Sequence, residues 1–297
     1  MIPIGKLVVI GVGLIGGSFA LALRRSGAAS RVVGVGRSKA NLETARRLGL
    51  VDRALTLDQS WTDELRDADL VFLATPVGEM PSLFVAIAPH VGLGTLITDG
   101  GSTKQDVIAA ARSHLGAAFA RFVPGHPIAG TEHSGAAAAF EALFRERVVV
   151  LTPVAETDLS AIAAVEDCWR RCGSVVRRLD AARHDAILSA VSHLPHVLAF
   201  ALMSEIAARP DADAYLDLAG TGLRDLTRLA SSHPALWRDV CLANREALRG
   251  DIARYRAVLE RIDALLERRD GEGLLELYAR ARNARDAWID RASSDEA

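Results

Sequence analysis

In the first half of the chain, short apolar runs alternate with segments in which apolar and polar residues repeat at helical spacing. The apolar runs are rich in Val, Ile and Leu, which is typical of strands that are buried on both faces of a sheet. We expect strands at residues 7–11, 31–35, 70–74, 96–99, 121–124, 148–151 and 175–177. We expect helices near residues 14–26, 38–48, 77–88 and 104–115. This alternation predicts an α/β fold with a doubly wound parallel sheet.

The hydrophobic pattern changes at about Asp180, beyond which the strand-like runs stop. Long segments rich in Ala, Leu, Arg and Glu follow, with apolar residues at helical spacing over 187–207 and 236–268. Pro195 falls inside the first of these segments, where it should either kink a helix or mark its start. We favour a start, with residues 192–195 forming the turn that leads into the helix.

The chain of 297 residues is long enough for two domains of about 150 residues each. We therefore expect an α/β domain over residues 1–178 and an all-helical domain over residues 179–297. The alanine-rich stretch at 135–139 predicts a short helix, because Ala is the best helix former.

Composition and charge argue against several classes of partner. The formal net charge is −2, so the chain lacks the positive field that holds nucleic acid or an anionic membrane surface. Its three cysteines form no CxxC pair, and an odd count fits a reducing compartment. The first residues run directly into a strand without a signal peptide, and no apolar stretch reaches the ~20 residues that span a bilayer. We expect a cytoplasmic protein that binds neither nucleic acid nor membranes.

Three glycines follow the first predicted strand at the GxGxxG spacing of dinucleotide-binding folds. Gly11 permits the tight turn, Gly13 lets the backbone approach a pyrophosphate, and Gly16 lets the next helix pack closely on the strand. Leu14 and Ile15 begin that helix, where backbone amides and the helix dipole favour phosphate. The pattern predicts a Rossmann-type domain at 1–178.

The end of the second predicted strand indicates which dinucleotide is bound. A carboxylate often stands about twenty residues beyond the glycine turn and clamps the ribose 2′-hydroxyl, but Gly36 is followed here by Arg37 and Ser38. A guanidinium and a hydroxyl can hold a 2′-phosphate, so we expect NADP to be preferred over NAD. The alternative is that Arg37 is a solvated loop residue.

Three further loops should open at the same edge of the sheet, because the carboxyl ends of parallel strands meet there. Thr75 and Pro76 follow one strand and would line the nicotinamide half of the cofactor, although Pro76 could simply belong to a strand-to-helix turn. Gly101 and Ser102 follow the next strand in "DGGSTK". The loop "GHPIAGTEHSG" adds a histidine, His126, to the same cleft.

Taken together, the motifs "GVGLIGGS", "DGGSTK", "GHPIAGTEHSG", "SHLPH" and "RDLTR" resemble those of the prephenate/arogenate (cyclohexadienyl) dehydrogenase family. The resemblance runs from Lys6 to about Trp237 in the same order. It implies an oxidoreductase of tyrosine biosynthesis that oxidatively decarboxylates prephenate, arogenate or both, giving 4-hydroxyphenylpyruvate or tyrosine. It also implies NADP or NAD as cofactor and a homodimer formed through the helical domain.

The resemblance assigns catalytic roles to two residues. His126 matches the family's catalytic base, and an imidazole with a pKa near 6.5 can take a proton from the substrate's C4 hydroxyl as hydride leaves C4. Ser102 would hydrogen-bond the same hydroxyl or orient His126. Alternatively, Ser102 could cap a helix that starts at Thr103.

The resemblance also assigns substrate-binding residues. His196 and Arg228 would bind the substrate's carboxylates, with Arg228 suited to a bidentate grip. Asp225 would hold an arginine in place, and His184–Asp185 would support the cleft. Thr131 and Glu132 would shape the same pocket, and Trp237 would cap it or lie at a subunit contact.

Two other functions are compatible with a dinucleotide fold. A dehydrogenase of the β-hydroxyacid type would rely on a lysine in the helical domain, but no lysine follows Lys104. A catalytically inactive NADP-sensing protein would need no catalytic histidine in this motif. A metal site is not expected, because the histidines show no HExxH spacing and no cysteine cluster occurs. No single residue distinguishes prephenate from arogenate.

Overall fold

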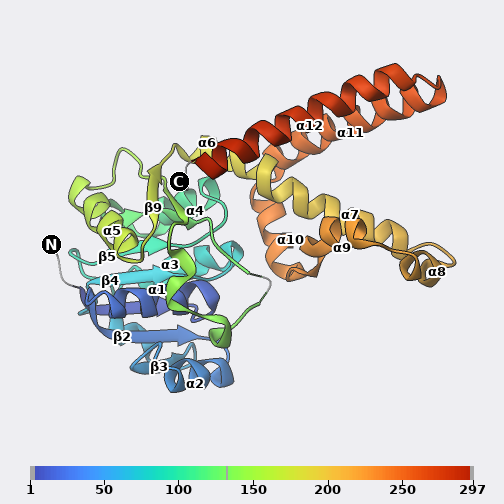
Figure 1. Cartoon of the computed structure of the whole chain (residues 1–297). Coiled ribbons are helices and arrows are strands. Elements are labelled where there is room, and N and C mark those ends of the chain that lie inside the picture. Colours follow the sequence, from blue (N-terminus) through green and yellow to red (C-terminus); the bar gives the residue numbers. More distant parts are fainter. Residues whose placement is uncertain (1–3, 132, 295–297) are drawn as a thin grey trace. The chain divides into compact units, whose positions relative to one another are not determined.

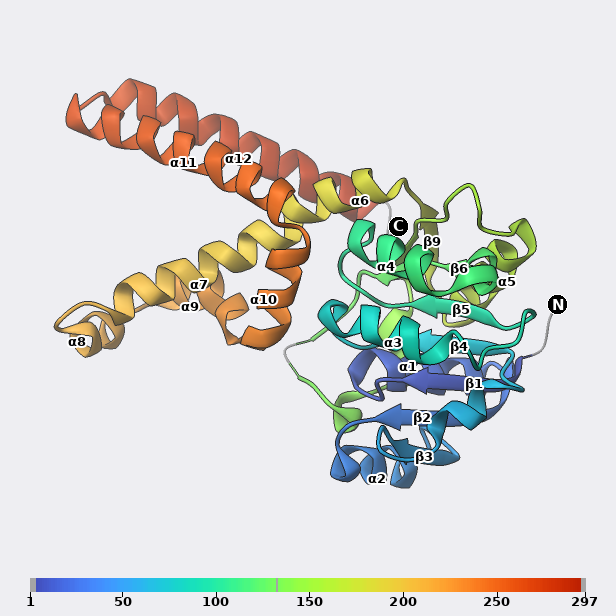
Figure 2. The same cartoon turned by 180° about the vertical axis from the view of Figure 1, so that it is seen from behind.

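The computed structural model describes residues 4–131 and 133–294. The described residues divide into two compact units, of which the first ends at Leu248 and the second begins at Arg249 (Figure 1). The first unit contains a six-stranded parallel sheet with the strand order β3-β2-β1-β4-β5-β6 (Figure 2). The strands are β1 (Ile4–Ile10), β2 (Ala29–Gly36), β3 (Arg53–Thr56), β4 (Leu70–Leu73), β5 (Leu96–Asp99) and β6 (Phe122–Val123). The predicted doubly wound sheet is confirmed.

Helices cover both faces of this sheet, which explains its continuous apolar strands. Along β1, Leu7 and Val9 join the hydrophobic cluster on one face, and Val8 and Ile10 join the cluster on the other. The first face packs against α1 (Leu14–Arg25), α2 (Lys39–Arg47) and α5 (Leu159–Arg171). The second packs against α3 (Met80–Ile87) and α4 (Gln105–His114).

The last two predicted strands, at 148–151 and 175–177, do not continue the large sheet, so that part of the prediction is wrong, and they pair instead with a short strand that was not predicted. Strands β7 (Gly125–Pro127), β8 (Val148–Leu151) and β9 (Val175–Arg178) form a separate sheet in which β7 and β8 are antiparallel. Pro124 separates β6 from β7, and because proline has no N–H for a strand ladder, the chain leaves the first sheet there. The edge strand β3 was not predicted, because "RALT" is short and carries a weak apolar pattern.

Beyond Arg178, every described element is helical. The first unit continues with α6 (Ala181–Leu188), a π-helical turn (Ser189–His193), α7 (Leu194–Ala207), α8 (Ala212–Asp217), α9 (Thr221–Thr227), the short helix η7 (Arg228–Ser231) and α10 (Pro234–Ala243). The expectation of a turn before Pro195 is wrong, because the chain stays helical from α6 to α7. The π-helical turn accommodates the proline, whose ring and missing N–H disrupt regular hydrogen bonding one turn earlier.

The continuous helical run Ala181–Ala207 is 27 residues long and by length and composition could cross a membrane. The run contains Arg183, Asp185 and Glu205, so it is not an uninterrupted apolar stretch, and a single helix of this kind is weak evidence for a membrane span. Only 22% of its most apolar window is buried. Its first turns nevertheless carry His184 and Asp185, whose buried side chains are hydrogen-bonded to the α/β part of the unit.

The predicted helix at 236–268 is two helices, α10 and α11 (Arg245–Glu267). The break falls at Asn244, which is buried and donates a 2.7 Å hydrogen bond to the carbonyl of Asp185. The second unit comprises most of α11 and the whole of α12 (Gly271–Ser294). The predicted short helix at 135–139 is a single 3-10 turn, Ala136–Ala138.

Candidate functional site

The turn between β1 and α1 depends on its glycines, because a side chain at Gly11 or Gly16 would collide with the backbone. Gly11 has a φ of +97°, and a Cβ there would lie 2.4 Å from the carbonyl oxygen of Ala74. A Cβ on Gly16 would lie 2.1 Å from the carbonyl oxygen of Gly11, so α1 can pack this closely only without a side chain. Gly13 is the N-cap of α1, and a Cβ there would meet no atom within 4 Å. The start of α1, with Leu14 and Ile15, therefore faces open space suited to an anion.

An asparagine that sequence reasoning missed holds this turn in place. The side-chain amide of Asn41 donates a 2.7 Å hydrogen bond to the carbonyl of Val12, and its oxygen accepts a 2.8 Å bond from the backbone of Ala136. Ser38 in turn caps α2, since its hydroxyl accepts a hydrogen bond from the backbone N–H of Asn41. An asparagine within a helix belongs to no recognised motif, so no local signal marked it.

Arg37 is an exposed loop residue, as the alternative hypothesis states, and it also has an ion-pair partner. Its Nη1 lies 2.9 Å from Oε1 of Glu79, a residue in the turn after β4 that the sequence analysis did not single out. The two side chains are 70% and 43% exposed, so a ligand can compete for either of them.

Thr75 and Pro76 lie between β4 and this turn. The Thr75 hydroxyl is buried without a hydrogen-bond partner in the part of the chain that the structure describes. An unsatisfied hydroxyl costs free energy unless a ligand completes it. The Thr75 hydroxyl, the backbone N–H groups at the start of α1 after Gly13 and the guanidinium of Arg37 are hydrogen-bond donors. Together they fit a dinucleotide.

A buried ion pair joins the two loops that carry Ser102 and His126. Asp99, at the end of β5, pairs with the ammonium group of Lys104, and both side chains are fully buried. Asp99 also accepts hydrogen bonds from the backbone N–H groups of Gly101 (2.8 Å) and Gly125 (3.1 Å). Lys104 donates a 2.7 Å bond to the carbonyl of Gly125. Breaking such a pair is costly, so it fixes the backbone beside His126.

Ser102 lies half-buried in the turn between β5 and α4. The alternative that it caps a helix starting at Thr103 is wrong, because α4 begins at Gln105 and its N-cap is Lys104.

His126 is the first member of a chain of three side chains. Its Nδ1 lies 2.8 Å from Nε2 of His184, and Nδ1 of His184 lies 2.8 Å from Oδ1 of Asp185. The Asp185 carboxylate also accepts 2.9 Å hydrogen bonds from the backbone N–H groups of Lys104 and Gln105. His184 and Asp185 are buried on α6, and His126 is partly buried on β7.

The charge of Asp185 determines where the protons lie in this chain. Burial opposes ionisation of Asp185, but hydrogen bonds from His184, Gln105 and Lys104 together lower its pKa below the ordinary value. As an ionised acceptor, Asp185 requires His184 to carry its proton on Nδ1. Nε2 of His184 then accepts a hydrogen bond from the protonated Nδ1 of His126, which leaves the lone pair of His126 on Nε2.

The pKa of His126 favours its neutral form. Burial lowers this pKa well below the ordinary 6.5, and positive charge on His184, Lys104 or His193 acts in the same direction. A neutral imidazole with its lone pair on Nε2 can accept a proton at neutral pH.

His196 lies on α7 and stacks on Trp237 of α10, with ring centroids 3.4 Å apart and an interplanar angle of 20°. Its Nδ1 donates a 2.9 Å hydrogen bond to the carbonyl of Ser192. Burial lowers the pKa of His196, and the charge of Arg228 acts in the same direction, so these two predicted residues share one neighbourhood. Trp237 orients the imidazole, a role that the sequence did not indicate.

The remaining predicted residues are less tightly held. Arg228 begins η7 and Asp225 lies on α9; both are exposed. Thr131 is exposed in the loop after β7 and accepts a 3.3 Å hydrogen bond from the backbone of His133. Glu132 lies outside the described residues.

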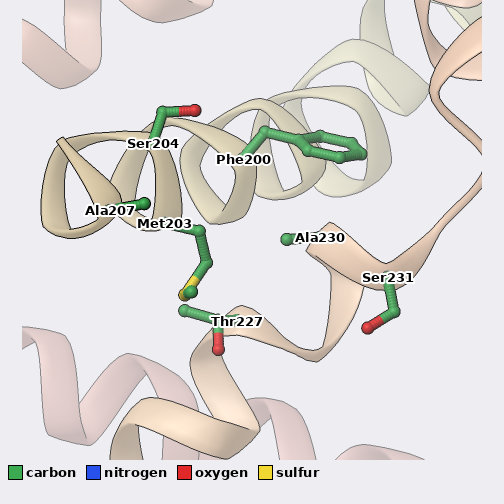
Figure 3. Close-up of a pocket in the computed structure, with 7 residues that line it drawn as sticks. All are labelled: Phe200, Met203, Ser204, Ala207, Thr227, Ala230 and Ser231. Atoms are coloured by element: carbon green, nitrogen blue, oxygen red, sulfur yellow. The ribbon is translucent and has the colours of Figure 1, made fainter. Parts of the chain in front are cut away.

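A cavity of about 390 Å³ lies among α7, α9 and η7 (Figure 3). It begins one turn beyond His196, at Phe200, and ends on residues that flank Arg228. Its lining mixes apolar side chains with hydroxyls: Phe200, Met203, Ser204, Ala207, Thr227, Ala230 and Ser231. Neither His126 nor Ser102 lines it, so it is separate from the candidate proton-transfer site.

The chain matches two family models in succession. Residues 19–178 match the nucleotide-binding domain of prephenate dehydrogenase, and residues 180–280 match the dimerization domain of the same protein.

Named relatives and solved structures match nearly the whole chain. A cyclohexadienyl dehydrogenase of Zymomonas mobilis is 35% identical, with 94% of each chain covered. The prephenate dehydrogenase of Aquifex aeolicus, solved with hydroxyphenyl propionate and NAD⁺, is 32% identical with a TM-score of 0.89, covering 96% of this chain and 98% of that one. An arogenate dehydrogenase of Synechocystis is 30% identical with a TM-score of 0.79, covering 95% and 99%.

Proposed function

This chain belongs to the prephenate dehydrogenase family, and we propose that it catalyses NAD(P)-dependent oxidative decarboxylation of prephenate, arogenate or both, in tyrosine biosynthesis. The observation that carries the mechanism is the hydrogen-bonded chain from His126 through His184 to Asp185. It presents a neutral imidazole whose free lone pair lies on Nε2. The family membership argues against a dehydrogenase of the β-hydroxyacid type.

In the proposed reaction, Nε2 of His126 takes the proton of the substrate's C4 hydroxyl. An oxidised nicotinamide, when bound, supplies the acceptor for the hydride that leaves C4. The ring carboxylate departs as carbon dioxide, and its bonding electrons complete the aromatic ring. The positive charge that develops on His126 is stabilised, through His184, by the Asp185 carboxylate. A carboxylate that holds a catalytic histidine acts in the same way. Ser102 binds the reacting hydroxyl.

The residues proposed to hold the dinucleotide are those of the glycine turn and the neighbouring strand ends: Gly11, Gly13, Leu14, Ile15, Gly16, Arg37, Ser38, Thr75, Pro76 and Gly101. We propose that NADP is preferred, because Arg37 supplies a cation beside the end of β2 and a guanidinium can grip a phosphate at two points. The solved relative from Aquifex aeolicus holds NAD⁺, so the preference needs its own measurement.

The substrate's carboxylates are assigned to His196 and Arg228, whose common neighbourhood supports this role. Asp225, Thr131 and Glu132 complete the proposed pocket. We propose that residues 1–178 bind the cofactor and that residues 179–297 bind the substrate and form the dimer. The match of residues 19–178 to a nucleotide-binding domain and of residues 180–280 to a dimerization domain supports this division.

We further propose a cytoplasmic homodimer formed through the helical part. Several large apolar side chains there are exposed, among them Leu218 (89%), Leu226 (64%) and Leu242 (64%). A second copy that covered these side chains would remove their apolar surface from water. A molar mass near that of one chain in light scattering at micromolar concentration would reject the dimer.

Steady-state kinetics with prephenate and with arogenate, each with NAD⁺ and with NADP⁺, test the proposal directly. Formation of reduced nicotinamide is followed by absorbance, and the aromatic product identifies the substrate. We expect turnover with at least one of the two acids, and a higher kcat/KM with NADP⁺ than with NAD⁺. A purified, folded protein that reduces neither nucleotide with either acid would instead be the catalytically inactive NADP sensor.

A further inference from the structure

The ion pair between Arg37 and Glu79 lies across the mouth of the proposed dinucleotide site. Arg37 directly follows β2, and Glu79 ends the turn Val77–Glu79 after β4. In the sheet, β2 and β4 are the two neighbours of β1, whose carboxyl end carries the glycine turn. Neighbouring strands are about 4.8 Å apart, so the pair bridges the end of β1.

We propose that Glu79 is a second determinant of cofactor selectivity, because its carboxylate competes with a ribose 2′-phosphate for Arg37. This inference rests on the proposed role of Arg37 in NADP binding. NAD carries a hydroxyl at this position and leaves the Arg37–Glu79 pair intact. When NADP binds, its 2′-phosphate binds the Arg37 guanidinium and the ion pair with Glu79 is lost. Glu79 is then an uncompensated negative charge close to the phosphate. Glu79 therefore weakens the binding of NADP and has little effect on NAD.

The strengths of the two interactions allow this exchange. Exposed ion pairs contribute little to stability, and both partners here are exposed. A phosphate of up to two negative charges that engages the guanidinium at two points is the stronger partner. Arg37 can therefore change partners, and the affinity for NADP is reduced by the loss of the first pair.

The backbone around Glu79 is held, so its carboxylate has a defined position. Its carbonyl accepts a 2.8 Å hydrogen bond from the Ser82 hydroxyl. A Cβ on the preceding Gly78 would lie 2.9 Å from Oδ2 of Asp239, so α10 packs directly against this turn. Asp239 is paired with Arg238 at 2.7 Å. The negative charge of Asp239 is thus compensated locally, whereas Glu79 depends on Arg37.

The test is the variant Glu79→Gln, which keeps the size and a hydrogen-bonding oxygen and removes the charge. Binding of NADPH and of NADH is measured by fluorescence titration without substrate. We expect the Kd for NADPH to fall about three- to fivefold, the upper part of the range for an exposed ion pair, and the Kd for NADH to stay within about twofold. Glu156→Gln is the matched control, because Glu156 forms a similarly exposed 3.0 Å pair with Arg112 elsewhere on the surface. It should change neither value.

Equal shifts for both nucleotides, or no shift for NADPH, would overturn the inference. Glu79→Gln is also made in an Arg37→Ala background, where the gain for NADPH should shrink. An undiminished gain there would show that Glu79 does not act through Arg37.

The substrate proposal is tested separately, since this assay needs no turnover. If the unmodified protein binds NADH more tightly than NADPH, the proposed NADP preference fails. The role of Glu79 is then still decided by the response of the Kd ratio to its substitution.

Discussion

Nδ1 of His126 lies 2.8 Å from Nε2 of His184, so two imidazoles stand in series between the open side of the site and the carboxylate of Asp185. In many active sites a carboxylate binds the catalytic histidine directly, whereas here a second imidazole lies between them. The second ring lets a buried carboxylate on α6 orient a base on β7 without lying beside the substrate. A carboxylate in direct contact with His126 would be repelled by the substrate's own negative charges.

Replacing His126 with Asn tests the proposed base. Asn has a similar polar outline but cannot accept a proton at neutral pH, so kcat should fall by about 10²- to 10⁴-fold, the contribution typical of a positioned general base. The Kd for NADPH should be unchanged. Turnover at the parental rate by a variant with an unaltered Tm would refute the proposed mechanism.

The pH dependence of kcat/KM for the acid substrate reports the pKa of His126 in the enzyme form that meets this substrate, which at saturating NADP⁺ is the NADP⁺ complex. Because burial lowers this pKa, the neutral, active form persists to below pH 6.5. Activity should therefore be present above the lowered pKa and be lost as the pH falls through it. The profile is recorded with NADP⁺ at saturation. An acidic limb centred at or above pH 6.5 would show that the buried environment does not lower the pKa of the base.

The substitution His184→Gln tests the second imidazole as a positioning residue. Without it, Asp185 no longer determines which nitrogen of His126 carries the proton. We expect kcat to fall about 10- to 100-fold, the size of effect seen when the partner that orients a metal-binding histidine is removed, with KM little changed.

His184 is fully buried, so the thermal melt of this variant must be compared with that of the parent. His114→Gln, an exposed histidine at the end of α4, is the control. A rise in KM with unchanged kcat would mean that His184 shapes the substrate pocket instead of orienting the base.

Two alanine substitutions in the glycine turn should have opposite effects. In Gly16→Ala the new Cβ would lie 2.1 Å from the Gly11 carbonyl, which is backbone and cannot easily move. Overpacking of this kind costs about 1–3 kcal/mol, so the Tm should drop. In Gly13→Ala the Cβ meets no protein atom, so the Tm should be kept while NADPH binding weakens. Parental affinity in Gly13→Ala would show that no cofactor phosphate approaches this glycine.

Local patterns in the sequence were sufficient to predict the doubly wound sheet, the glycine turn and the change to helices after β9. The apolar run of β1 and the GxGxxG spacing are properties of a few consecutive residues, and short-range sterics and burial decide their conformation. The motif around His126 likewise identified the candidate base, because imidazole is the side chain whose unperturbed pKa lets it accept a proton near neutral pH.

Only the tertiary structure showed which groups surround those residues. His126 and His184 are 58 positions apart, and Arg37 and Glu79 are 42 apart. Such contacts follow from the packing of whole elements, which no local periodicity encodes. The separate small sheet beginning at β7, the π-helical turn before Pro195 and the burial of Lys104 against Asp99 have the same origin. Sequence alone therefore determined which groups can react, and packing decided which of them are oriented, paired and charged.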